Sequence, residues 1–406
     1  IKKRITGIDL MLKICENSHK YAAKIFLYGV ICRNEVFIEG VSVGQFEAFT
    51  MRADHRTFGA TATLTIPLYG LGIEKRAMQT PTRSAGRANS RILSAYERVN
   101  VNICAEVEVY CWYEGYDKTL VFRGYIEHIG EGFPVTLYLR DGSFIMKFGA
   151  IEQGWDSDAT LQQIVEDCIP VAQAAFKEER NKYGFSREVK PLKYSLHGTN
   201  VQAFTTPLSF KNYAVGRAPF EIMQHLMQYL VMYGGVDYDN GVFIGTGVAD
   251  TTRPVIKLDT RYNVVGREII PVDGRFVDYD VKVSGVLKNG KIYTATGGLR
   301  NSRSVEARSD FGRVSAVSQR CMCNHDTAEG IQDFANRLLA DLKGSYNKGS
   351  ITLLMYPKVQ LLDHVEYNDT VFDIHDALYY VTSYTFSANE RGYFQKLEVT
   401  DLVFML

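Results

Sequence analysis

The chain has 406 residues, and its 46 lysines and arginines balance 46 aspartates and glutamates, so its formal net charge is zero. Zero net charge argues against a general nucleic-acid binder, which needs a basic face to displace counterions from phosphates. Hydrophobic residues make up 46% and charged residues 23% of the sequence, which excludes wholesale disorder. At roughly 100–200 residues per domain, the length predicts two to four domains.

Cysteine and aromatic usage narrow the class further. The seven cysteines are odd in number and scattered, which is typical of assembly in a reducing cytoplasm and unlike a disulfide framework. No stretch reaches the ~20 apolar residues of a membrane span, and residues 1–20 lack the apolar core of a signal peptide. The 25 tyrosines and 22 phenylalanines favour strands and are common at interfaces, so a β-rich assembly component is the leading class.

Strand-like sequence dominates after an N-terminal arm at residues 1–34. Alternating apolar residues between turn residues predict a meander of hairpins, which would close into a small β-barrel domain over residues 35–150. The predicted strands are 46–51, 61–66, 101–112, 120–129 and 135–139.

Residues 71–100 interrupt this domain with a polar, weakly periodic stretch, which predicts a long loop. Its six basic residues are the one local charge asymmetry of the chain. A solvated loop is the simpler explanation, and the alternative is a loop that faces a lumen, nucleic acid or an acidic partner. The residues that would face such a lumen or partner are Arg76, Arg83, Arg87 and Arg91.

Apolar residues recur at helical spacing after Gly154, which predicts a helix-containing insert domain over residues 151–259. The Asp-Ser-Asp at residues 156–158 offers N-caps for the first helix. Pro170 should end or kink this helix, although residues 171–183 could continue it.

A second helix in this insert is predicted from Pro219 to Val231, because proline is favoured in the first turn of a helix. Gly234-Gly235 is expected to stop it. Asn240-Gly241 lies between apolar runs and predicts a hairpin, since both central residues of such a turn need positive φ.

Residues 260–406 predict a second β-barrel domain with one helix at 327–342, for which Asp326 is the expected cap. Asn289-Gly290 predicts another hairpin. The predicted strands are 350–356, 365–367, 378–386 and 394–403. The fold class is therefore β-rich α+β, with two small tube-type β-barrel domains and a helix-containing insert domain between them.

Two motifs resemble ligand-binding loops. Residues 285–291 match the first seven positions of a phosphate-binding loop, but Ile292 replaces the hydroxyl residue that holds magnesium and no helix follows. The acidic run at 237–241 resembles a calcium loop, but its glycine comes too early and no bidentate glutamate ends the loop. Turns explain both motifs better than ligands.

Cys321, Cys323 and His325 alternate, so they would share one face of a strand. A metal would need a fourth ligand from a distant position such as His364 or His375. Two small buried thiols at the entrance to a helix explain the pattern better, and we predict no metal and no cofactor.

Asp141, Asp156 and Asp158 could supply paired carboxylates for a glycan or cell-wall hydrolase, near the aromatic Trp155. Turn and cap roles explain these aspartates without catalysis, so the chain is predicted not to be an enzyme. A third hypothesis is a β-rich sugar-binding adhesin, which would bind glycans through exposed aromatic side chains.

Three stretches resemble a known family. The first runs through Val121-Phe122-Arg123-Gly124-Tyr125-Ile126, then Leu137–Gly142. The second is Thr160–Ile164 followed by the helix and hairpin of 220–245. The third includes Leu378-Tyr379-Tyr380-Val381 and Gly392-Tyr393-Phe394-Gln395.

In this order the stretches are similar to the baseplate hubs of phage tails, the late control protein D-like family, which includes the hub portion of contractile injection and type VI secretion spike proteins. The family-motif positions, which the resemblance implies to be structural, are Phe122, Gly124, Tyr125, Ile126, Asp141, Leu161, Tyr379, Tyr380, Val381 and Gly392.

The resemblance implies a homotrimer. Two similar barrels in each of three chains would form a pseudo-six-fold ring that joins a hexameric tail tube to a trimeric spike. Its expected partners are the tube protein, a spike on a separate polypeptide and other baseplate proteins, around a lumen through which DNA could pass. The expected location is the virion tail or baseplate, after assembly in the host cytoplasm.

Overall fold

The computed structural model describes residues 32–67, 101–130, 132, 134–156, 159–195, 213–230, 232–237, 239–246, 255–273, 279–288, 291–297, 317–323, 325–354, 358–361, 363–389 and 392–401. The predicted arm at 1–34 is therefore described only from residue 32. The loop at 71–100, with Arg76, Arg83, Arg87 and Arg91, lies outside the described residues.

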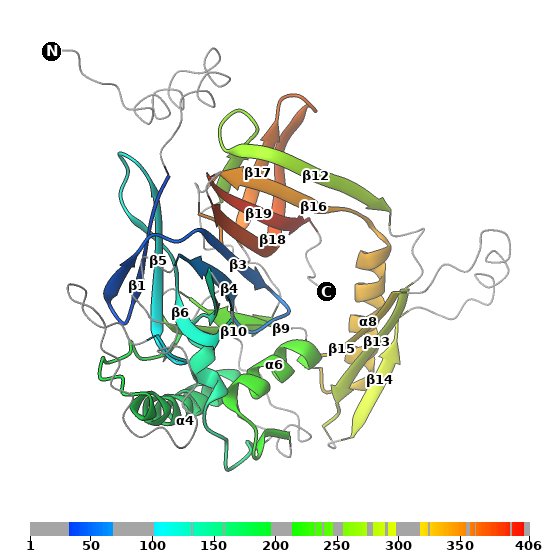
Figure 1. The fold of residues 1–406 in the computed structure, drawn as a ribbon. Coiled ribbons are helices and arrows are strands. Elements are labelled where there is room, and N and C mark those ends of the chain that lie inside the picture. Colours follow the sequence, from blue (N-terminus) through cyan, green and yellow to red (C-terminus); the bar gives the residue numbers. More distant parts are fainter. Residues whose placement is uncertain are drawn as a thin grey trace, which may run out of the picture.

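A 13-stranded, mainly antiparallel sheet organises the molecule (Figure 1). Its N-terminal half-sheet runs in the order β3-β4-β7-β6-β5-β1-β2. The strands are β1 (Cys32–Ile38), β2 (Val41–Gly44), β3 (Ala48–Asp54), β4 (Thr61–Ile66), β5 (Glu106–Tyr113), β6 (Thr119–Ile129) and β7 (Val135–Arg140). The prediction of a strand from residue 101 was wrong at its start, because Cys104 takes a positive φ of 72° that breaks extended structure.

The C-terminal half-sheet continues the same ladder. Its strands are β11 (Ile256–Asp259), β12 (Val264–Asp273), β16 (Ser345–Leu354), β17 (His364–Asp369), β18 (Ile374–Asn389) and β19 (Gly392–Thr400). The order is β12-β16-β19-β18, with β17 paired to β18 and β11 paired in parallel to β17. The predicted β-rich class is thus confirmed, and the strands of both halves belong to one large, mainly antiparallel sheet.

The long strand β18 joins the two half-sheets. Its first residues, Ile374 to Tyr380, pair with β17, and residues 383–388 pair with β3. β17 and β3 therefore lie one after the other along the same edge of β18, and β19 pairs along its opposite edge. The 16 residues of β18 thus belong to both half-sheets. We call the β3–β18 pairing the seam.

Helical elements pack beside the N-terminal half-sheet (Figure 1). They are the 3-10 helix η2 (Gly142–Lys147), α4 (Leu161–Lys182) and α6 (Pro219–Leu230), accompanied by β8 (Lys193–Tyr194), β9 (Met232–Val236) and β10 (Gly241–Thr246). The predicted hairpin is confirmed, since β9 and β10 pair antiparallel, but its turn is not the expected two-residue Asn-Gly turn. Asn240 has a φ of 59°, whereas Gly241 is already the first residue of β10, and the turn closes between Asp237 and Gly241.

The structure corrects two details of the predicted helices, the cap of α4 and the end of α6, and decides the effect of Pro170, which the sequence left open. The cap of α4 is Thr160, whose hydroxyl accepts from the backbone N–H of Gln163 at 3.2 Å, so the cap is not in 156–158. Pro170 does not end α4, which continues to Lys182. Gly234-Gly235 lies within β9 and does not stop α6, which ends earlier, at Leu230.

A small unit has a core of its own. The strands β13 (Tyr279–Val286), β14 (Ile292–Thr296) and β15 (Val317–Met322) form a three-stranded sheet, and α8 (Ala328–Lys343) packs on it. Its buried side chains include Val281, Val283, Ala295, Ile331, Ala335 and Leu338. The Thr327 hydroxyl accepts from the Gly330 N–H at 3.1 Å, so Thr327 supplies the cap that we expected from Asp326.

The main core is continuous through both half-sheets. Phe49 on β3 lies 5.8 Å from Phe122 on β6 and 6.2 Å from Phe386 on β18, measured between ring centroids. All three rings are buried, and burying each stabilises the fold by about 1.5–3 kcal/mol. The half-sheets therefore fold around one hydrophobic cluster.

Candidate functional site

The motif positions on β6 hold the N-terminal half-sheet together. Phe122, Tyr125 and Ile126 are buried. Gly124 faces the backbone of β7 so closely that an added Cβ would lie 2.2 Å from the carbonyl oxygen of Arg140. These positions build the core, and Gly124 permits the close approach of two strands.

Asp141 directly follows β7 and is buried. Its carboxylate accepts from the backbone N–H of Ala60 at 2.6 Å and of Ser143 at 3.0 Å, which caps η2 and ties it to the chain before β4. Burial raises the pKa of this carboxyl above its ordinary value, against these hydrogen bonds, which lower it. Asp141 therefore has a complete structural role.

The remaining motif positions are also structural. Leu161 is the buried first residue of α4. On β18, Tyr379 and Val381 are buried, and Tyr380 packs edge-on against His364 with a centroid distance of 4.7 Å. Gly392 opens β19 with a φ of 131°, which favours glycine.

The loop before β17 contacts both half-sheets. Lys358 donates from Nζ to the carbonyl of Leu120 on β6 at 3.0 Å, so this loop contacts the N-terminal half-sheet. The backbone N–H of Val359 donates to Oε1 of Gln395 on β19 at 3.2 Å. Burial lowers the pKa of Lys358 to about 8, because the ammonium is held away from water.

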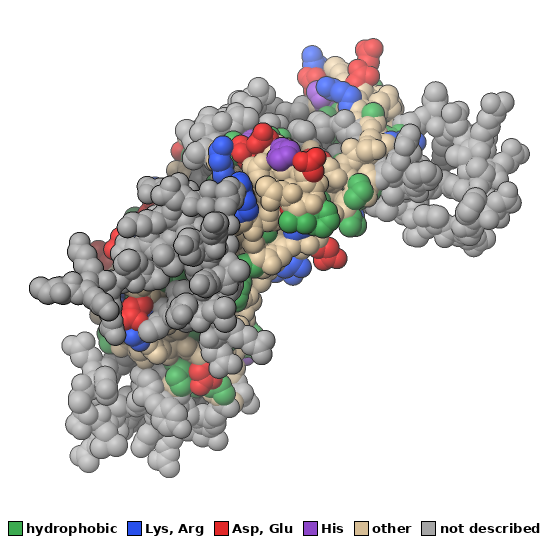
Figure 2. All heavy atoms as spheres, turned by 90° about the horizontal axis from the view of Figure 1, so that it is seen from above, with side chains coloured by type: hydrophobic (Ala, Val, Ile, Leu, Met, Phe, Trp, Pro, Cys, Tyr) green, Lys and Arg blue, Asp and Glu red, His purple; other side chains and the backbone are tan. Residues whose placement is uncertain are grey.

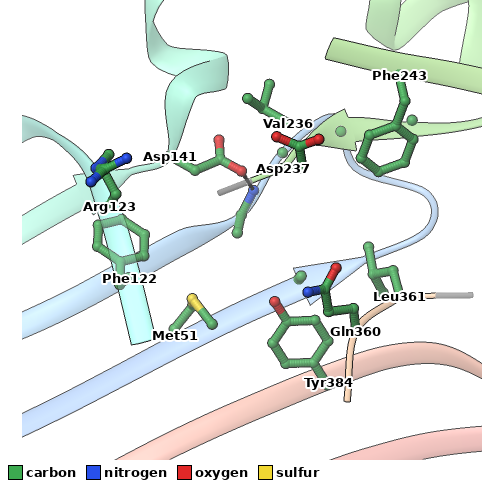
Figure 3. Close-up of a pocket in the computed structure, with 15 residues that line it drawn as sticks. Met51, Phe122, Arg123, Asp141, Val236, Asp237, Phe243, Gln360, Leu361 and Tyr384 are labelled. Atoms are coloured by element: carbon green, nitrogen blue, oxygen red, sulfur yellow. Dashed lines mark hydrogen bonds between the residues drawn. The ribbon is translucent and has the colours of Figure 1, made fainter. Parts of the chain in front are cut away.

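A pocket opens beside the seam, with space for about 60 Å³ of solvent (Figure 3). Asp141 and Asp237 lie on one side of it, and Gln360, Leu361 and Tyr384 on the other. Asp237 accepts from the backbone N–H groups that close the β9–β10 turn, and Asp141 is bound as described above. The two carboxylates are thus used in turns, which explains the acidic run at 237–241 without calcium.

A buried ion pair fastens α4 to the β1–β2 turn. Nη1 and Nη2 of Arg180 each donate to one carboxylate oxygen of Glu39 at 2.9 Å, and Nη1 also donates to the carbonyl of Cys104 at 2.6 Å. The Arg180 side chain is only 4% exposed. Bidentate geometry and full hydrogen bonding make this pair an anchor between the helical region and the N-terminal half-sheet.

Exposed apolar side chains gather on the C-terminal half-sheet. Of ten large exposed hydrophobic residues among those described, seven lie on or next to β11, β12, β17 and β18. We call these seven the apolar rim: Val255, Tyr262, Val265, Ile270, Val371, Phe372 and Leu378. Figure 2 views the molecule from above and shows small groups of hydrophobic side chains among charged ones.

Two turns bring part of the apolar rim together. The Thr260 N–H donates to the carbonyl of Asn368 at 3.2 Å, which sets the β11–β12 turn beside the end of β17. The Arg267 guanidinium on β12 lies 3.2 Å from the Asp369 carboxylate and 4.3 Å from the centroid of Phe372. Exposed apolar side chains beside paired charges, as at these turns, are suited to protein contacts.

The other candidate sites are not assembled as ligand sites where the structure describes them. The residues of the phosphate-loop match form the β13–β14 hairpin, whose turn at 289–290 lies outside the described residues. Among the described residues no group of three His, Cys, Asp or Glu could hold a metal. Trp155 donates to Asp167 at 2.8 Å, and Asp158 lies outside the described residues.

Known protein structures have a similar fold, although their sequences are only distantly similar. No family model matches the sequence, and no curated protein is similar enough in sequence to match. The tail protein from Neisseria meningitidis MC58 is 14% identical with a TM-score of 0.54, over 92% of this chain and 98% of that one. The 43 kDa tail protein of prophage MuSo2 from Shewanella oneidensis is also 14% identical, with a TM-score of 0.51, over 90% and 96%.

This chain has the fold of phage tail proteins. The resemblance read from the sequence is thereby confirmed in the fold, along nearly the whole chain. No helix among the described residues is both long and apolar enough to cross a membrane.

Proposed function

We propose that this protein is a structural hub of a phage tail or related injection baseplate, with no turnover chemistry. Three copies would form a pseudo-six-fold ring that joins a hexameric tail tube to a trimeric spike. Each half-sheet is then one tube-type barrel domain, and the helices between them form the insert domain. The virion tail or baseplate is its place of action, reached after assembly in the host cytoplasm.

The observation that carries this proposal is the single sheet with two half-sheets in one chain. A ring of three such chains presents six sheet units around its axis, which suits a six-fold partner on one side and a three-fold partner on the other. The seam fixes the two units relative to one another, so their spacing does not depend on the neighbouring chain.

Two further features support assembly over a solitary role. The end strands of the main sheet path, β2 and β12, have no second partner strand among the described residues. Free strand edges and an apolar surface are features that proteins usually cover. In this proposal neighbouring chains, the tube and the spike cover them, and the loop at 71–100 faces the lumen or a partner.

Native mass as a function of concentration tests the proposal. The purified protein is measured alone and with the tube and spike proteins encoded beside it. We expect a species of three chains, at least when the spike is present. A chain that stays monomeric with every such neighbour would contradict the proposal.

A further inference from the structure

Three aromatic rings and a carboxylate gather on the outward face of β1 and β5. Glu35 on β1 lies opposite Tyr110 on β5, and Phe37 and Trp112 are their neighbours on the same face. The rings of Phe37 and Tyr110 meet edge to face with centroids 5.6 Å apart. The alternate residues of these strands, such as Val36, fill the core. We call the outward group the aromatic cage: Glu35, Phe37, Tyr110 and Trp112.

An ammonium group occupies this cage. The Nζ of Lys118 lies 4.2 Å from the centroid of Phe37, 4.3 Å from that of Tyr110 and 5.7 Å from that of Trp112. It also donates to Oε2 of Glu35 at 2.6 Å. Three ring faces within about 6 Å of one cation, together with a carboxylate, form a recognised type of ammonium site.

The carboxylate sets the chemical class of the occupant. A primary ammonium can donate a hydrogen bond to Glu35, whereas a quaternary ammonium has no N–H to donate. The Ser42 hydroxyl donates to the other oxygen of Glu35 at 2.6 Å and so orients it. Burial raises the pKa of Glu35, but the hydrogen bonds from Lys118 and Ser42 bring it below its ordinary value, which keeps the carboxylate charged.

Neighbouring cations on this face have carboxylates of their own. Arg33 pairs with Glu114 at 3.7 Å, and Arg123 pairs with Glu108 at 2.7 Å. Glu35 itself bonds to Lys118 and Ser42.

Lys118 is placed so that it can leave. It lies in the turn between β5 and β6, outside both strands, and its side chain is 34% exposed. Its departure would return a lysine to water without exposing the core, because the cage is on the outward face. The cage also lies on β1, which is next to β2, the end strand of the sheet. A chain that approaches this end of the sheet would reach the cage.

We propose that the aromatic cage is a binding site for a lysine side chain of a neighbouring protein chain, and that Lys118 fills it until that lysine arrives. The site recognises a primary ammonium through Glu35 and the three rings. Exchange of one lysine for the other releases the β5–β6 turn, so binding and turn mobility are linked.

Titration with Nα-acetyl-lysine N-methylamide tests this proposal. The compound carries the lysine side chain without a charged backbone, and binding is followed by calorimetry and by the fluorescence of Trp112. Lys118→Ala empties the cage, and Lys118→Gln is a second variant that keeps a long polar side chain. Lys118→Ala combined with Glu35→Gln is the matched control, with folding of all variants checked by circular dichroism.

We expect saturable binding to Lys118→Ala, with an affinity about ten-fold or more above that of the wild type, which must first release Lys118. The double variant should bind about ten-fold more weakly than Lys118→Ala, and tetramethylammonium should bind Lys118→Ala more weakly than the lysine compound. No saturable binding by Lys118→Ala and Lys118→Gln, or equal binding by the double variant, would overturn the proposal. If the wild type shows no binding at any concentration of the compound, Lys118 never leaves the cage, and this result would also overturn the proposal.

Discussion

The two half-sheets are covered differently. The N-terminal half-sheet packs against η2 and α4, and its ion pair between Arg180 and Glu39 is buried. The C-terminal half-sheet carries the apolar rim, with Val371 80% exposed. The difference teaches that the helical region covers one half and leaves apolar side chains of the other half exposed. The helical region stabilises one half, and we infer that partners cover the other.

The largest effect is expected where the N-terminal half-sheet meets α4. Arg180→Met should lower the free energy of unfolding by about 3–5 kcal/mol, because the Glu39 carboxylate would stay buried without its partner. Urea unfolding measures this loss. The control is Arg261→Met in the C-terminal half, where the arginine that pairs with Asp259 is 40% exposed and not 4% exposed like Arg180, and it should lower the free energy of unfolding by no more than about 1 kcal/mol. Equal losses in the two variants would contradict the comparison.

A similar loss is expected at the seam. Phe49→Ala should cost about 3–5 kcal/mol, because it leaves a cavity between Phe122 and Phe386 in the shared core. Hydrogen exchange should then speed up in both half-sheets. The control is Val281→Ala, which should loosen only the sheet covered by α8. Faster exchange confined to the N-terminal half-sheet after Phe49→Ala would show that the seam does not couple the halves.

The seam is also the part of the fold that sequence could not predict. The alternation of apolar and polar residues predicted strands near β3 and β18, but it does not show which strands pair. Phe49 and Ala388 pair with one another although most of the chain separates them in sequence. The Arg180 to Glu39 contact is equally distant in sequence. By contrast, the hairpin of β9 and β10 is local in sequence and was predicted correctly, although the form of its turn was not.

Some elements gave weak or misleading local signals. β12 was missed, since Pro271 interrupts its pattern, although a proline is tolerated on this end strand of the sheet. The aromatic cage was missed because its members lie on two strands that are far apart in the sequence, β1 and β5. A sequence signal for the cage does exist. In these strands buried apolar residues alternate with residues that face outward, and the outward-facing residues include aromatic side chains.

A smaller, pH-dependent effect is expected at Lys358. Its folded pKa of about 8 lies below its ordinary value of 10.5, so the unfolded chain binds more protons between these values. The buried charge therefore destabilises the fold fully below pH 8, and this penalty disappears as the pH rises to 10.5.

Lys358→Met removes that penalty at every pH. Its stability relative to the wild type should fall by about 1.4 kcal/mol per pH unit between pH 8 and pH 10.5. Chemical unfolding of both proteins across this range measures the difference. A difference that does not change with pH would mean that Lys358 is not held in a buried, charged state.

The smallest effect on the isolated chain is expected in the apolar rim. Val371→Asp should change the free energy of unfolding by no more than about 0.5 kcal/mol, because the side chain is exposed. It should weaken association by about ten-fold or more, since a carboxylate would be buried in the assembled contact. The control is Val215→Asp, an exposed valine outside the apolar rim. Equal weakening by both variants, measured by sedimentation, would remove the apolar rim as the association surface.

The central claim is that one chain supplies two of six similar units to a ring. Electron microscopy of the purified oligomer, viewed along its axis, tests this claim most directly. We predict a ring of six lobes around a lumen, with three-fold symmetry when the lobes are compared in detail. A ring with any other number of lobes, or a compact particle without a lumen, would contradict it.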